Sequence, residues 1–327
     1  MSKKFNNNTL LIILVALIAV FFLVKWYQKS YTDNTLNANL VQIDTAKVSK
    51  IVIYPVVDSR SEIRLFRDGK DWKVAKGNVT SETESNTPTS LLGMLSEIKT
   101  KRLASKDKSK WADFNLTDTA ATRVKVYEGN DVVLDLLIGR FSYQQGNSQY
   151  GGMYGGGGTG TTYVRLNGKN EVYAIDGFLT FSFNQKFSAF RKQTLAKLDM
   201  PNITKVTFKY PADSGYVLEL RDKSWSIGNI KVDSANVANY LNSVNYKNAT
   251  SFVDNYSPVG MPACQLTFEG KDMKPLVIDA WMRSNNDYIL NSNRNAKSWF
   301  GTNNNGLFQE LFKGKKYFLD VKKPKKK

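Results

Sequence analysis

Three short segments, IVIY (51–54), EIRLFR (62–67) and GKDWKV (69–74), predict two strands, a polar turn and a third strand that carries Trp72. The same order returns later, with Trp225 in the third strand, in the segments VTFKY (206–210), YVLELR (216–221) and DKSWSI (222–227). In the first copy, Asp68-Gly69 lies at the junction of the second and third segments and is a strong signal for a hairpin turn. The unit therefore indicates an antiparallel sheet formed twice. Because they hold equivalent positions, we predict that Trp72 and Trp225 are buried structural core markers.

A helix is predicted after each unit. Thr87 and Pro88 are typical of a helix start in the first copy, and Asp233 is the cap candidate in the second. Apolar residues then recur on one helical face. In the two copies they are Leu91, Leu92, Leu95 and Ile98, and Val237, Tyr240, Leu241 and Val244.

The spacing of the two copies indicates an internal duplication. Trp72 and Trp225 are 153 positions apart, whereas Leu95 and Leu241 are 146 apart, so the second copy has a loop shorter by seven residues. The sequence predicts an α+β protein with two tandem duplicated modules, each an antiparallel sheet with a packed helix. We place the first module at 41–200 and the second at 201–321.

An apolar run, Leu10–Val24, precedes the modules and predicts an N-terminal transmembrane helix. Fifteen helical residues span about 22 Å, and Trp26 and Tyr27 extend the span toward a bilayer core. A cleaved signal peptide would need a cleavage site of small residues directly after the apolar run, where the chain instead has Lys25 to Lys29. A buried core helix is not expected either, because lysines flank the run on both sides. We therefore expect a signal anchor at 10–27.

The topology around this anchor follows from the short basic N-terminus. Residues 1–9 carry Lys3 and Lys4 and are expected in the cytoplasm. A polar linker at 28–40 then leads to the modules, which places the C-terminal body in the periplasm and the protein, as a single-pass chain, in the inner membrane. The lipid bilayer is thus a predicted partner.

Composition excludes several kinds of chemistry. The chain has 327 residues, one cysteine and no histidine, which removes Ser-His-Asp and Cys-His catalysis and the usual transition-metal ligands. Its formal charge of +17 includes nine lysines near the two ends, among them those of the basic tail 322–327. The remaining +8 is too small for a nucleic-acid stripe. We predict no catalytic, cofactor or metal site, and a buried core thiol at Cys264.

Two segments differ from the repeated pattern. The glycine-rich run 146–160 has no phosphate-loop motif and is typical of a flexible hairpin extension; a sharper interpretation is a loop that contacts a partner through Tyr150, Met153 and Tyr154. Five phenylalanines lie between Phe178 and Phe190. They are expected to cover the first sheet, and an exposed aromatic patch is the alternative.

Short motifs resemble those of a bacterial family, domain of unknown function 4340, over roughly residues 45–320. They are Val48 to Ile53 with Trp72, Ile138-Gly139-Arg140, Tyr163-Val164-Arg165 and Phe190 to Leu195. The resemblance implies a membrane-anchored protein outside the cytoplasm, and some members occur with ABC-type transporter parts of the gliding-motility kind. It implies no catalytic residues.

These observations predict a non-enzymatic, membrane-anchored accessory or scaffold protein of the bacterial cell envelope. Its partners would be other envelope membrane proteins, with an ABC-type transporter complex as one candidate. The alternative is a cell-envelope glycan-binding module that uses Trp111, Trp281 and Trp299. A hydrolase with Ser/Lys or carboxylate chemistry is the third hypothesis.

Overall fold

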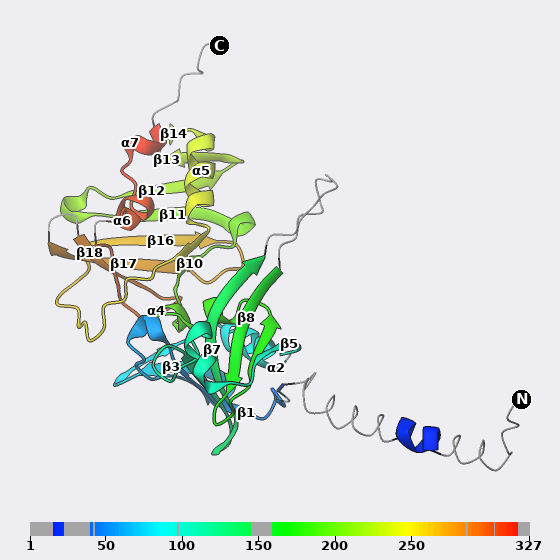
Figure 1. Ribbon diagram of the computed structural model, residues 1–327. Helices are drawn as coiled ribbons and strands as arrows, with labels where there is room; N and C mark the ends of the chain where they lie inside the picture. The colour runs from blue at the N-terminus through cyan, green and yellow to red at the C-terminus, as the bar shows by residue number, and fades with distance from the viewer. Residues whose placement is uncertain are drawn as a thin grey trace, which may run out of the picture. The chain divides into compact units, whose positions relative to one another are not determined.

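A computed structural model describes residues 16–22, 40–41, 43–96, 98–144, 159–284, 287–303 and 305–319 (Figure 1). The predicted residues Tyr150, Met153 and Tyr154, the basic tail and almost all of the predicted linker lie outside these ranges. Residues 16–22 are helical. Across the described ranges, no helix has the length and apolar character needed to cross a membrane.

The first sheet has the strand order β4-β3-β2-β1-β6-β7-β8-β9-β5 in the described chain. Neighbours from β1 through β6, β7, β8 and β9 to β5 pair antiparallel. Its strands are β1 (Val48–Tyr54), β2 (Ile63–Asp68), β3 (Asp71–Lys76), β4 (Val79–Glu82), β5 (Thr100–Ser105), β6 (Thr122–Glu128), β7 (Asp131–Gln144), β8 (Thr159–Leu166) and β9 (Val172–Asp176).

The second sheet has the order β14-β13-β12-β11-β16-β17-β18-β19. Both of its outermost strands are two residues long. The strands are β11 (Ile203–Lys209), β12 (Tyr216–Arg221), β13 (Ser224–Ile227), β14 (Ile230–Lys231), β16 (Cys264–Gly270), β17 (Leu276–Ser284), β18 (Asp287–Ser292) and β19 (Phe300–Gly301). A separate pair joins β10 (Thr194–Lys197) to β15 (Tyr246–Asn248).

The α-helices that follow residues 16–22 are short. They are α2 (Thr87–Ser96), α3 (Leu179–Phe183), α4 (Phe187–Phe190), α5 (Ser234–Val244), α6 (Leu307–Leu311) and α7 (Lys316–Leu319). Both predicted helices are confirmed as α2 and α5. Every apolar residue predicted on their inner faces is at most 5% exposed, and Asp233 caps α5 by accepting a hydrogen bond from the Ala235 amide at 2.8 Å.

The chain divides into two compact units, residues 1–64 with 89–185 and residues 65–88 with 186–327. In the second unit α5, α6 and α7 gather beside strands β11 to β14 (Figure 1). Tyr240 of α5 is fully buried and donates its hydroxyl hydrogen to the Leu311 carbonyl at 2.7 Å. Phe318 of α7 packs edge-on against the same Tyr240 ring. The core of this unit therefore lies between the sheet and the three helices.

Candidate functional site

The described residues offer no group of acids or cysteines that could hold a metal ion. Cys264 is 3% exposed, and burial raises the pKa of its thiol, so it is a poor nucleophile. Asp135 accepts two hydrogen bonds from Arg123, at 2.8 and 2.6 Å, in an ordinary partly exposed ion pair. These groups therefore provide no sign of acid–base or nucleophilic chemistry.

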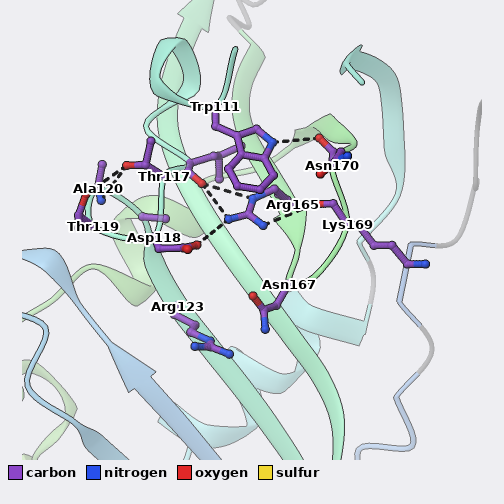
Figure 2. Close-up of polar contacts among 12 residues, drawn as sticks. Trp111, Thr117, Asp118, Thr119, Ala120, Arg123, Arg165, Asn167, Lys169 and Asn170 are labelled. Carbon is purple, nitrogen blue, oxygen red and sulfur yellow. Dashed lines mark hydrogen bonds and ion pairs between the residues drawn. The ribbon is translucent and has the colours of Figure 1, made fainter. Parts of the chain in front are cut away.

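Trp111 is covered by a buried arginine in the first unit. Figure 2 shows Arg165 of β8 beneath the indole ring, with its guanidinium carbon 3.5 Å from the ring centre. The guanidinium donates to the Leu116 carbonyl at 3.1 Å and to Asp118 at 2.9 Å, and the Trp111 ring nitrogen donates to the Asn170 carbonyl. This Trp111 face is used in packing and is not free to stack on a sugar.

Trp72 and Trp225, predicted to be buried core markers, are both half-buried. They lie on β3 and β13, each next to the outermost strand of its sheet, where less of the chain covers the side chains. Trp225 packs on the margin of the core of the second unit, and the Arg67 guanidinium lies 4.9 Å from the Trp72 ring centre. Both side chains are therefore mostly covered, but they lie at the margin of the packed residues and not at the centre of a core.

The phenylalanine segment is split between core and surface. Phe183, Phe187 and Phe190 are buried, as expected for a covering segment. Phe178 and Phe181 are about half exposed and contact each other across 6.4 Å between ring centres. Both alternatives from the sequence thus hold for different members of the segment.

A second set of aromatic residues gathers in the second unit. Trp281 of β17 and Trp299, just before β19, meet edge to face with 5.1 Å between ring centres. Tyr256 packs against Trp299 at 5.0 Å. All three side chains are half-buried, so they form a surface cluster and not part of the closed core.

The loop between β15 and β16 presents apolar side chains beside this cluster. Val259 and Met261 are each 90% exposed, more than any other described large hydrophobic residue. Pro258 and Pro262 flank them and restrict the backbone. Gly260 lies between them at a φ of 70°, and its carbonyl accepts a hydrogen bond from the Trp281 ring nitrogen at 3.4 Å. The tip is therefore held in place while its apolar side chains face water.

A cavity of about 560 Å³ opens between the loop and the sheet. Its lining is mostly apolar and includes Tyr256, Met261, Trp281, Met282 and Ile289. Methionine and aromatic side chains of this kind adapt to apolar partners and are enriched in protein interfaces. The loop and the cavity together form the candidate binding site.

Arg283 is the charged residue in this lining, and it is already engaged. Its guanidinium donates to Asp287 at 2.7 Å and to the Asn303 side chain at 2.9 Å. Burial opposes ionisation of Asp287, but hydrogen bonds from Arg283, Thr302 and the Asn303 amide lower the pKa of this carboxyl. The polar edge of the site is therefore a fixed network.

The sequence predicted some residues of this site but not that they lie together. Trp281 and Trp299 were candidates for ligand contact, and the structure brings these two together but leaves Trp111 in the other unit. Val259 and Met261 were missed; an apolar pair between two prolines was the available signal.

Neither the curated proteins nor the solved structures include a match to this chain. The model of a family described as a domain of unknown function (DUF4340) matches residues 72–266, more than half of the chain, and the chain therefore belongs to that family.

Proposed function

We propose that the chain is a membrane-anchored, periplasm-facing, non-enzymatic accessory protein of the bacterial cell envelope. It binds a partner protein through the Pro258–Pro262 loop and the adjoining cavity. The observation that carries this proposal is the 90% exposure of Val259 and Met261 on a loop whose shape is fixed. An ABC-type transporter complex is the partner class that the family resemblance favours.

Exposed apolar groups on a fixed loop bind at low conformational cost. Folding has already ordered the loop, so a partner that covers Val259 and Met261 gains apolar burial of about 25 cal/mol per Å² with little further ordering. A flexible loop would lose part of that gain in entropy. The geometry therefore suits insertion of the loop tip into an apolar pocket of the partner.

The cavity favours a protein over a glycan. Sugar recognition uses several polar groups to hold hydroxyls, whereas this lining is mainly valine, methionine and aromatic carbon. The ring nitrogen of Trp281 is used by Gly260, and Arg283 is bonded to Asp287 and Asn303. With Trp111 covered by Arg165, the glycan alternative loses a further aromatic residue.

The two sheets support the proposed duplication. Each begins with a four-strand meander. After the helix and one further strand, β5 or β15, the following strand, β6 or β16, lies beside the first strand of the meander. The pairing shifts register between Val48 and Lys50 in one sheet and between Ile203 and Lys205 in the other. A shared irregularity at matching positions is expected of copied segments. Superposing the two sheets in an experimental structure tests this: misaligned shifts would contradict it.

Site-specific photo-crosslinking in intact cells tests the binding function. A photoreactive amino acid at position 261 should give a covalent adduct of one defined mass, identified by mass spectrometry. The same group at Val132, an exposed valine on β7, is the matched control and should give none. The double variant V259D/M261D should abolish co-purification of that partner.

Because both side chains are almost fully exposed, V259D/M261D should change the free energy of unfolding by less than about 0.5 kcal/mol. A circular dichroism melt therefore separates loss of binding from loss of fold. Unchanged co-purification with the double variant, or an adduct at position 132 alone, would overturn the proposed site.

A further inference from the structure

A second cavity of the same unit, about 540 Å³ in volume, is lined by charged side chains. Glu84 follows β4, Lys197 ends β10, Asp199 comes two residues later, and Arg294 lies in the turn between β18 and β19. With Lys192, five charged residues from three parts of the sequence line this cavity: Lys192, Lys197 and Arg294 are basic, and Glu84 and Asp199 are acidic.

Lys192 of the lining pairs with Glu82 at 3.2 Å. The other four side chains, two of each sign, form no ion pair with a residue that the structure describes. Two cations and two carboxylates without counter-ions thus remain available to a ligand.

Hydrogen bonds fix three of the four groups and leave other polar atoms unused. The Glu84 carboxylate accepts from the Thr194 amide at 3.1 Å and from its hydroxyl at 2.5 Å, both through Oε1. Asp199 accepts from the Asn202 side chain through Oδ2, and Arg294 donates one N–H to the Lys274 carbonyl. These bonds position the charges in advance. The second carboxylate oxygens and most of the Arg294 guanidinium donors form no hydrogen bond with a residue that the structure describes.

The residues next to Glu84 and Arg294 in the sequence carry unpaired polar atoms. Thr83 Oγ1 and Asn295 Oδ1 are buried without a hydrogen-bond partner in the described chain, and neither residue lines the cavity. The wall itself is firm, because Thr194 and Leu198 are buried and β10 pairs with β15. Buried unpaired polar atoms are rare in folded proteins and call for an explanation.

We propose that this cavity binds a short peptide with free termini. The carboxylates of Glu84 and Asp199 would repel a simple anion. In the same way, Lys197 and Arg294 would repel a simple cation. A zwitterionic ligand satisfies both pairs, with its carboxylate toward the cations and its ammonium toward the acids. A volume of about 540 Å³ lies within the range of small-ligand sites and exceeds the needs of a single small amino acid.

Isothermal titration calorimetry with the full chain in detergent tests the proposal, using trialanine as the probe. N-acetyl-trialanine amide, which lacks both terminal charges, should not bind, and acetate and inorganic phosphate should bind at least tenfold more weakly than trialanine. K197Q and D199N should each weaken the binding of trialanine by about two- to fivefold, as removal of one exposed ion pair does.

K209Q is the matched control, because Lys209 is an exposed lysine of the same unit outside the cavity lining, and it should leave the affinity unchanged. Lys197 and Asp199 are also exposed, so their variants should keep the wild-type melting temperature. Equal binding of the capped peptide, equal binding of phosphate or acetate, or wild-type affinity in both K197Q and D199N would overturn the proposal. It does not depend on the proposed partner-binding function.

Discussion

Arg191 donates to Asp254 at 2.8 Å while its guanidinium carbon lies 3.7 Å from the centre of the Phe252 ring. The arginine side chain is 4% exposed, and the aspartate is about one-third exposed. Phe187 contacts the same guanidinium from 5.2 Å. This contact fixes the start of the β15–β16 segment, whose later residues form the candidate binding site.

Replacing Arg191 by lysine should lower the free energy of unfolding by about 2–3 kcal/mol. Lysine keeps the charge but loses the planar stacking and the forked hydrogen bonds, and hydrogen bonds to charged groups contribute about 1.5–3 kcal/mol. Urea denaturation measures the change. R221K is the control, since Arg221 is 70% exposed and a surface pair contributes less than about 1 kcal/mol. Equal effects of the two variants would contradict a special role for Arg191.

Glycine 139 should not tolerate a methyl group. A Cβ there would lie 2.2 Å from the Phe114 carbonyl oxygen, so G139A should destabilise the protein by about 2–3 kcal/mol or more. Gly93 lies in helix α2, where an added Cβ would have no atom within 4 Å, and G93A should stabilise the protein by about 0.5–1 kcal/mol. Thermal denaturation of both variants measures the two changes in stability. If both variants were stabilised, or both destabilised, the close packing around Gly139 and the open space at Gly93 would be contradicted.

Alkaline pH should destabilise the second unit. Burial raises the pKa of Tyr216 and of Tyr210, whose hydroxyls both donate to the Lys313 carbonyl. Unfolded tyrosine has a pKa of about 10, so above that pH the unfolded chain releases protons that the folded chain retains. The contribution of these two tyrosines to the free energy of unfolding is therefore fully present below about pH 10, and it is lost as the pH rises further.

Urea midpoints between pH 8 and pH 11.5, read by circular dichroism, measure this alkaline loss. The variant Y216F should show a shallower fall above pH 10 than the wild type, because one buried phenol no longer titrates on unfolding. Y143F, at an exposed position, is the control. A midpoint that stays constant up to pH 11.5 would contradict burial of these phenols.

The thiol of Cys264 should react with Ellman's reagent only when the chain opens. It is 3% exposed, and burial disfavours the thiolate that carries the reaction. At pH 8 the native protein should react at least about 100-fold more slowly than the protein in 8 M urea. Rapid labelling without denaturant would show that β16 is less protected than its packing indicates.

Local patterns predicted the helices and the strand meanders well. The apolar spacing that ends at Val244 places that residue in the core at 0% exposure, and the cap at Asp233 is formed. These features depend on neighbours within a few positions, so a single sequence contains them. The burial of Trp72 depended on how far the rest of the chain covers β3, which spacing cannot provide.

The candidate site depends on contacts between distant segments. The Trp281 ring nitrogen donates a hydrogen bond to the Gly260 carbonyl, 21 residues away in the sequence. The Thr194 amide donates one to Glu84, 110 residues away. Arg165 is a further case, because an arginine at 2% exposure contradicts the usual preference of this residue for the surface. The packing of Trp111, the Leu116 carbonyl and the ion pair with Asp118 together make that burial favourable.

The two-residue strands β14 and β19 that close the second sheet limit how this protein can associate. A strand from another chain can extend a sheet only where a row of unpaired backbone groups is long enough to pair, and these rows are too short. Fibre-like growth through this sheet is thereby disfavoured. A partner that binds at the edges of this sheet must instead be selected by side-chain shape and charge, which point mutations can alter one residue at a time.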